Sequence, residues 1–213
     1  TPAPTKEGFT FDGWYEDSTF SKKFDFNTPI TDSMTLYAKW TENKEYSIVS
    51  GTIKSYNPNN PVTVRLIEQG HHEVAYETTI DPTTGSGQKE QNFSFDAVAA
   101  GTYDLVVTKA AHLSYTVTGV VVKGTAIDLT KHTNAAISTI TLLCGDIDGD
   151  GWIDFSDYQE LLKSTNYGKQ TSAVGVNKIA DLDGDTWIDF SDYQILLSSQ
   201  HYGKSTVSVS FAG

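Results

Sequence analysis

Two twelve-residue segments near the C-terminus hold most of the residues that could bind a cation. They run from Asp146 to Asp157 and from Asp181 to Asp192, and ten of their twelve positions are identical. Each segment contains five aspartates. Clustered carboxylates repel one another unless a cation neutralises them, and a hard divalent ion such as Ca²⁺ prefers oxygen ligands. Because the pattern occurs twice, two cation sites are favoured over acidic turns without metal.

The aspartate spacing resembles that of the EF-hand calcium loop, whose ligands come from positions 1, 3, 5, 7, 9 and 12. In the first loop the corresponding residues are Asp146, Asp148, Asp150, Trp152 (through its carbonyl), Asp154 and Asp157. In the second loop they are Asp181, Asp183, Asp185, Trp187 (through its carbonyl), Asp189 and Asp192. Position 6 favours glycine because the chain turns sharply there; Gly151 fits, whereas Thr186 does not. We therefore expect two Ca²⁺ ions, with the second site weaker or more distorted.

A helix is expected after each loop, over Phe155–Ser164 and Phe190–Ser199, since apolar residues recur there at helical spacing. No helical pattern precedes residue 155, and the first loop follows the strand-like run Ile137–Leu143. Each repeat thus consists of a loop and one outgoing helix.

This tandem arrangement, with aspartate at position 12, resembles the type I dockerin family over residues 144–205. The resemblance implies a small all-α module that binds a cohesin domain of a scaffoldin or cell-surface protein and is otherwise monomeric. It places the partner contacts on the outgoing helices, at Phe155, Ser156, Leu162, Lys163, Tyr167, Phe190, Ser191, Leu197, Ser198 and Tyr202. The near identity of the two faces indicates docking in two orientations. The alternative for Phe155 and Phe190 is packing inside the module.

Residues 45–143 are expected to form an immunoglobulin-like antiparallel β-sandwich, because short β-rich runs alternate with turn clusters. The predicted strands are Tyr46–Lys54, Val62–Gln69, Glu73–Ile80, Asn92–Phe95, Tyr103–Lys109, Tyr115–Val122 and Ala136–Leu143. The runs Val98–Lys109 and Tyr115–Val122 resemble carboxypeptidase-regulatory-like sandwiches and the X modules that often precede dockerins. That resemblance implies a stabilising or spacing role.

Residues 1–43 resemble the C-terminal part of an internalin-type B repeat, also called the Listeria–Bacteroides repeat. The resemblance rests on the runs Pro4–Tyr15, Phe24–Ile30 and Thr35–Trp40 and implies a partial β-grasp-like unit of a bacterial surface protein. Its opening strand is missing before Thr1, so the sequence is expected to be a fragment of a longer protein. Trp14 and Trp40 are expected in its small core.

Composition narrows the function. The net charge of −12 argues against nucleic acid, and no apolar run is long enough to insert into a membrane. The single cysteine, Cys144, is expected to be a small buried residue. No catalytic pattern stands out, and the histidines are expected to be solvated: His71, His72, His112, His132 and His201.

The chain is therefore predicted to be multidomain and mainly β, with a partial repeat, a sandwich, a small all-α dockerin and a tail at 206–213. The favoured function is a non-catalytic, calcium-dependent assembly module of an extracellular or cell-surface protein. The first alternative is a calcium-rigidified stalk of a surface adhesin. A carbohydrate-binding sandwich is the weaker alternative, because residues 45–143 contain no tryptophan to stack on a sugar.

Overall fold

The structure is a computed structural model that describes residues 3–212; residues 1, 2 and 213, at the ends of the first and last predicted segments, lie outside it. The chain forms two compact units, residues 1–45 and 46–213. The second unit contains both the predicted sandwich and the two acidic loops.

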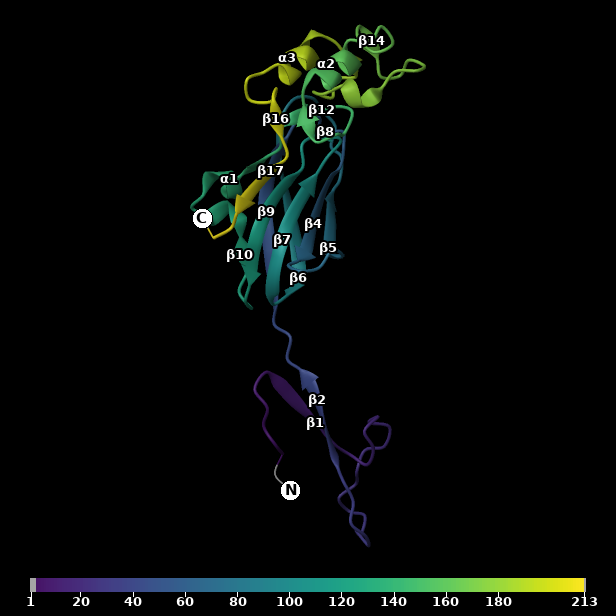
Figure 1. Cartoon of the computed structure of the whole chain (residues 1–213), viewed down its shortest axis with the longest axis vertical. Helices are drawn as coiled ribbons and strands as arrows, with labels where there is room; N and C mark the ends of the chain where they lie inside the picture. Colours follow the sequence, from purple (N-terminus) through teal and green to yellow (C-terminus); the bar gives the residue numbers. More distant parts are fainter. Residues whose placement is uncertain (1–2, 213) are drawn as a thin grey trace. The chain divides into compact units, whose positions relative to one another are not determined.

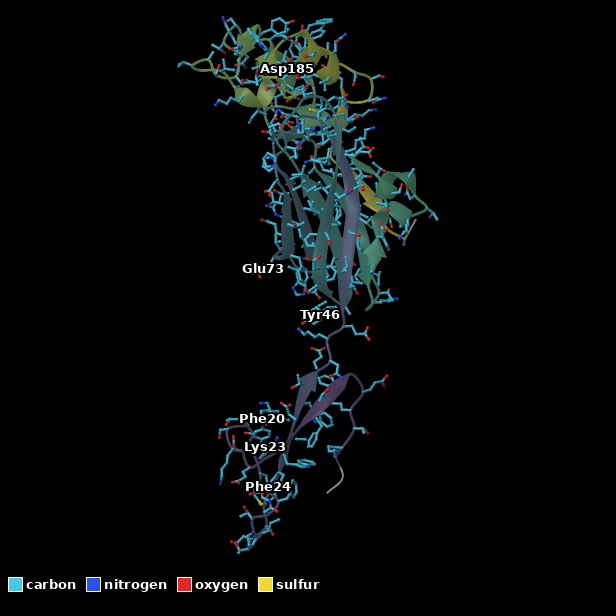
Figure 2. All side chains as sticks on the ribbon, turned by 180° about the vertical axis from the view of Figure 1, so that it is seen from behind. Phe20, Lys23, Phe24, Tyr46, Glu73 and Asp185 are labelled. Atoms are coloured by element: carbon cyan, nitrogen blue, oxygen red, sulfur yellow. The ribbon has the colours of Figure 1, made fainter. Side chains whose placement is uncertain are left out.

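The N-terminal unit is built on two antiparallel strands, β1 (Phe9–Tyr15) and β2 (Tyr37–Glu42). The ring of Phe11 lies 5.5 Å from that of Trp14 and 5.2 Å from that of Trp40, so these residues form one aromatic cluster. Figure 2 labels three residues of the connection between the strands: Phe20, Lys23 and Phe24. Among residues 3–45, β1 and β2 are the only regular elements.

The second unit contains a sandwich of two β-sheets (Figure 1). The larger sheet has the order β17-β9-β7-β4-β5, and in the smaller sheet β3 pairs with β6, β10 and β11. Alternate residues of the strands are buried, such as Val62, Val64 and Leu66 of β4, and they form one apolar core. The strands are β3 (Tyr46–Ser55), β4 (Val62–Glu68), β5 (Val74–Ile80), β6 (Lys89–Ala99), β7 (Gly101–Thr108), β8 (Ala111–His112), β9 (Tyr115–Val122), β10 (Ile127–Asp128), β11 (Ile140–Thr141) and β17 (Val207–Ser210).

Six of the seven predicted strands are present; β9 has the predicted bounds, and the other five have shifted ends. The strand predicted over Ala136–Leu143 is wrong. Helix α1 (Ala135–Ser138) takes its first half, because the Asn134 side chain accepts a hydrogen bond from the Ala136 N–H and caps this helix. A 3₁₀ turn, η1 (Leu129–Lys131), precedes it. The pairings of β10 and β11 with β3, and of β17 with β9, are parallel, so the sandwich is not purely antiparallel.

The prediction of a small all-α module over residues 144–205 is also wrong. This segment has only two α-helices, α2 (Phe155–Leu161) and α3 (Phe190–Leu196), of seven residues each. Both end three residues before the predicted ends, where the chain turns: Asn166 Nδ2 donates to the Glu160 carbonyl at 2.7 Å, and His201 Nδ1 lies 2.8 Å from the Ile195 carbonyl. The remaining elements are β12 (Cys144–Asp146), β13 (Trp152–Ile153), β14 (Lys169–Gln170), η2 (Lys178–Ala180), β15 (Trp187–Ile188) and β16 (Lys204–Ser205).

The loop-and-helix segment, residues 144–205, shares a second apolar core with the sandwich. Cys144, which is free and buried as predicted, packs there with Leu113 of the sandwich and with Leu161 and Leu196 of the helices. Strand β12 pairs with β8. The segment lies at the end of the second unit opposite Tyr46, as the positions of Tyr46 and Asp185 show (Figure 2).

The predicted tail folds back onto the sandwich. Its residues Val207–Ser210 form β17, which pairs with β9 at the edge of the larger sheet. Beyond it, the Phe211 carbonyl lies 3.0 Å from Nε2 of His132, and the two rings are 4.9 Å apart. The loop-and-helix segment is therefore fastened to the sandwich both where it begins and where it ends.

Candidate metal centres and the adjoining surface

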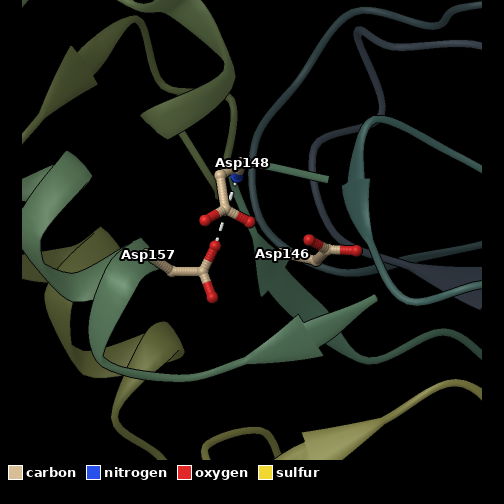
Figure 3. A group of neighbouring side chains, drawn as sticks. All are labelled: Asp146, Asp148 and Asp157. Atoms are coloured by element: carbon tan, nitrogen blue, oxygen red, sulfur yellow. Dashed lines mark hydrogen bonds between the residues drawn. The ribbon is translucent and has the colours of Figure 1, made fainter. Parts of the chain in front are cut away.

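Three aspartates of the first loop (Asp146–Asp157) come together. Ligand oxygens of Asp146, Asp148 and Asp157 all lie within 4.8 Å of one another (Figure 3). Asp157 is completely buried, and its carboxylate accepts hydrogen bonds from the backbone N–H groups of Ile147 (2.6 Å), Asp148 (3.2 Å) and Asp154 (2.9 Å). The loop therefore wraps around the carboxylate at position 12.

The carbonyl at position 7 is oriented by strand pairing. The carbonyls of Gly151 and Ile153 accept from the N–H groups of Thr206 (3.2 Å) and Gly203 (2.7 Å). Successive carbonyls of a strand point to opposite sides, so the Trp152 carbonyl between them faces away from β16. This orientation leaves it available as a ligand.

The second loop (Asp181–Asp192) has a similar construction, but it brings together the aspartates of positions 1, 3 and 5 instead of those of positions 1, 3 and 12. Ligand oxygens of Asp181, Asp183 and Asp185 lie within 4.8 Å of one another. Asp192 is completely buried and accepts from the N–H groups of Leu182 (2.6 Å), Asp183 (3.2 Å) and Asp189 (2.8 Å). Thr186 adopts a φ of 80°, the left-handed conformation that position 6 requires. The expected strain at this threonine is therefore present.

Burial makes the carboxylates of both loops costly to ionise without a counter-charge. Desolvation, together with repulsion from Asp157, raises the pKa of Asp146 to about 6, and desolvation raises the pKa of Asp181 to about 6. Desolvation likewise raises the pKa of Asp192 to about 7 and moves the pKa of Asp157 upward. A bound cation would favour the ionised forms that these buried positions disfavour.

The residues of both loops fit a hard divalent cation, because every candidate ligand is an oxygen and the deepest carboxylate is already fixed by three N–H donors. The remaining predicted ligands are placed differently. In the first loop Asp150 accepts from the Trp152 N–H at 2.8 Å, and Asp154 caps α2 by accepting from the Ser156 N–H at 2.8 Å. The Ser156 hydrogen bonds lower the pKa of Asp154. Asp189 caps α3 in the same way.

An aromatic row connects the two outgoing helices. The rings of Phe155 and Tyr158 stack at 5.6 Å, those of Phe190 and Tyr193 stack at 5.7 Å, and Tyr158 lies 6.1 Å from Tyr193. Phe155 is 59% exposed and Phe190 is 58% exposed. Both phenylalanines thus remain open to solvent, although each stacks on a tyrosine of its own helix.

The other predicted contact residues are placed unequally. Tyr167, Tyr202, Lys163 and Leu197 are exposed, whereas Leu162 packs partly into the second core. The hydroxyls of Ser156 and Ser191 donate to the capping aspartates, at 2.8 and 2.9 Å. Ser198 is half-buried.

Three features of the site were missed from sequence. Tyr158 and Tyr193 join the two helices, and the Trp152 and Trp187 side chains are 54% and 44% exposed beside the loops. Their recurrence in both repeats was a usable signal. The third feature is a pair of hydrogen bonds from Asn57 and Asn59 of the sandwich to the backbone of the second loop. No sequence signal predicts them, because the paired residues are over a hundred positions apart.

Two histidines expected to be solvated are buried, His112 and His201. Nε2 of His112 accepts from the Tyr56 N–H at 3.2 Å, so Nδ1, 2.7 Å from the Ala110 carbonyl, carries the proton. Burial lowers the pKa of His112 to about 3 and also lowers that of His201. Both histidines are thereby held neutral.

Sequence comparisons find similarity to known proteins in the N-terminal unit. Residues 1–39 match the Listeria–Bacteroides repeat domain. Internalin H of Listeria monocytogenes is 33% identical over 105 residues, which cover 47% of this chain and 16% of internalin H. A putative membrane protein of Evansella cellulosilytica is 49% identical over 41 residues, covering 19% of this chain and 6% of that protein. The chain thus spans only a small part of either relative. None of the helices that the structure describes is long and apolar enough to cross a membrane.

The fold of the second unit is also found in solved structures. Chains from crystal structures of two interface mutants of a type II cohesin–X–dockerin complex of Acetivibrio cellulolyticus align with TM-scores of 0.55 and 0.54. Both are 24% identical and cover 75% of this chain and 97% of that chain. Residues 1–143 make up only about two thirds of this chain, so the likeness in fold extends into the loop-and-helix segment.

Proposed function

We propose that this chain is a non-catalytic assembly module that binds a cohesin domain when its loops hold Ca²⁺. It would anchor a larger extracellular protein in a cellulosome-like or cell-surface complex. The observation that carries this proposal is the aromatic row on two helices that each begin inside an acidic loop. Similarity in fold to chains of cohesin–X–dockerin complexes supports it, and the Listeria–Bacteroides repeat supports a bacterial surface location.

The loops would couple cation binding to the surface. Asp157 is both position 12 of the first loop and the third residue of α2, where it completes a capping box with Asp154. Asp192 has the same two roles at α3. A bound Ca²⁺ would neutralise the buried carboxylates. The same aspartates then hold the first turn of each helix, which presents Phe155 and Phe190.

The test is titration calorimetry against a panel of type I and type II cohesins, in millimolar calcium and again in excess chelator. We expect binding in calcium that is lost with chelator. Phe155→Ala and Phe190→Ala each remove an exposed ring, and the double variant should lose at least about tenfold in affinity, as for an interface anchor. The matched control is Phe26→Ala, which removes a 54% exposed phenylalanine of the N-terminal unit.

Docking in two orientations would make the single variants milder than the double variant, because either helix face would suffice. If Phe155→Ala alone abolishes binding, the two-orientation proposal is wrong. Cohesin binding that survives the double variant would contradict the role of the aromatic row.

A calcium-rigidified stalk of a surface adhesin is the second candidate, and the match of residues 1–39 to the Listeria–Bacteroides repeat favours it. A stalk needs the cations for rigidity but no cohesin. Uptake of two Ca²⁺ ions without binding to any cohesin would therefore support the stalk over the assembly module.

A further inference from the structure

The second loop is held by two turns of the sandwich, residues 57–60 between β3 and β4 and residues 85–87 between β5 and β6. Asn57 Nδ2 donates to the Asp181 carbonyl at 2.7 Å, and Asn59 Nδ2 donates to the Gly184 carbonyl at 2.7 Å. We call these two asparagines the asparagine latch. The contacts join the sandwich to the first half of the loop.

The latch does not occupy the candidate ligands. Its acceptors are the backbone carbonyls of loop positions 1 and 4, and a third backbone bond runs from the Gly87 N–H to the carbonyl of position 3 at 2.7 Å. None of these carbonyls is a ligand in the EF-hand pattern, which uses the carbonyl of position 7. The backbone is therefore fixed while the carboxylates of Asp181, Asp183 and Asp185 remain clustered.

The latch is itself pre-ordered. Asn57 is buried and has a φ of 52°, a left-handed conformation that asparagine tolerates better than most residues. Its Oδ1 accepts from the Asn59 N–H at 3.2 Å, and Asn59 Nδ2 also lies 3.0 Å from the Gly85 carbonyl. The turn thus needs little further ordering to hold the loop.

The first loop is not held in this way. Gly149 and Gly184 are equivalent, with φ values of 80° and 84°. A Cβ built on Gly184 would lie 2.6 Å from Asn57 Oδ1 and 2.7 Å from Asn59 Nδ2. A Cβ on Gly149 would have no atom of the described structure within 4 Å. The latch therefore acts on one of two loops that are nearly identical in sequence.

We infer that Asn57 and Asn59 are positioning residues for the second loop, which they pre-order for Ca²⁺ and thereby compensate for threonine at position 6. This inference rests on the proposed function, since it requires that the loops bind Ca²⁺. Pre-ordering raises affinity because less conformational entropy is lost when the ion binds. The second site would accordingly not be the weaker one, although its loop carries the strained residue.

The test is calcium titration calorimetry on Asn59→Ala and on Asn57→Gly, in which glycine keeps the positive φ. The control is Asn60→Ala in the same turn. Each variant is measured in an Asp148→Ala background, in which only the second loop binds, and in an Asp183→Ala background, in which only the first loop binds. We expect the dissociation constant of the second loop to rise about fivefold for each latch variant, as for one lost hydrogen bond, with the first loop unchanged.

A second readout needs no cation. Hydrogen exchange of the Gly184 and Thr186 amides in chelator should be faster in Asn59→Ala than in Asn60→Ala, while the Gly149 and Gly151 amides stay unchanged. Unchanged affinity and exchange in the second loop would overturn the inference, and so would equal weakening of both loops, which indicates general destabilisation. If the unmodified chain takes up no Ca²⁺, the proposed function fails as well. Two ions taken up with no effect of the latch variants would overturn this inference alone.

Discussion

The two acidic loops have nearly the same sequence but different surroundings. The first carries Gly151 at position 6, and its strands β12 and β13 pair with β8, which contains the buried His112, and with β16. The second carries Thr186 there and is held by Asn57 and Asn59 of the sandwich. Internal duplication thus explains why both loops carry the same candidate ligands, whereas the rest of the fold determines which contacts surround each loop.

The largest effect is expected from Asp157→Ala and Asp192→Ala. Each removes a buried carboxylate that accepts three backbone N–H groups, so the free energy of unfolding should fall by about 3 kcal/mol or more. Calorimetry should also show one bound Ca²⁺ instead of two in either variant. Retention of two ions would contradict the assignment of position 12. A smaller loss for Asp192→Ala than for Asp157→Ala would show that the latch holds the second loop without its carboxylate.

Gly149→Ala and Gly184→Ala form a matched pair. Both place a Cβ on a residue with positive φ, at a cost of about 1 kcal/mol each. Only Gly184→Ala also presses against the asparagine latch, which should add about 2 kcal/mol by overpacking. Urea unfolding of both variants measures this difference directly. Equal destabilisation of the two variants would mean that Asn57 and Asn59 move aside for the new Cβ without lowering the free energy of unfolding.

Acid should weaken the packing around His112, because this buried histidine titrates, whereas the asparagines of the latch do not. The pKa of His112 is lowered to about 3 in the fold, so below its ordinary value of 6.5 the unfolded chain binds the extra proton. Stability is therefore full above pH 6.5 and falls by up to about 1.4 kcal/mol per pH unit as the pH drops toward 3. The measurement is unfolding of the chain and of His112→Asn in chelator between pH 7 and 5. The aspartates are common to both proteins, so their opposite pH dependence cancels in the difference. If the difference in free energy of unfolding between the two proteins does not change with pH, protonation of His112 is not what weakens the fold in acid.

The smallest effect is expected from exchanging position 6. Thr186→Gly relieves the strain of a β-branched residue at a φ of 80°, but glycine gives the unfolded chain more freedom, so the net gain should be about 0.5 kcal/mol. Gly151→Thr should cost a similar amount in the first loop. Thermal unfolding of the two variants with and without calcium measures both changes. A loss on Thr186→Gly would show that threonine is preferred at this position.

Local patterns predicted much of the fold and of the site. Alternation of apolar residues located six strands, and the repeat located both loops and the starts of both helices. The failures occurred where a distant partner decides the structure. Residues 204–205 carry no strand signal of their own, yet they pair with β13. Residues 207–211 do alternate between apolar and polar, and the prediction of a tail overlooked this short strand signal. The helices were predicted too long because the contacts that end them, from Asn166 and His201 to the carbonyls of Glu160 and Ile195, interrupt no apolar spacing.

The asparagine latch could not be predicted for the same reason, because its partners are distant in sequence. Asn57-Pro58-Asn59-Asn60 is typical of a turn, and only the fold brings its amides to carbonyls 124 and 125 residues away. His112 was placed in solvent because one histidine between strands gives no burial signal. Its neighbours Tyr56 and Cys144 come from separate parts of the chain.

Strand β17 has a consequence for how the protein is made. It completes the larger sheet by pairing with β9, and the contact from Thr118 to Val209 spans 91 residues of sequence. On the ribosome the edge of β9 therefore emerges well before the strand that covers it, and in the meantime its free amides can pair with a neighbouring chain. The sandwich closes this edge only after the whole loop-and-helix segment has been synthesised. The late pairing of β17 therefore raises the risk of aggregation while the chain is being synthesised, and it does not lower the stability of the finished fold.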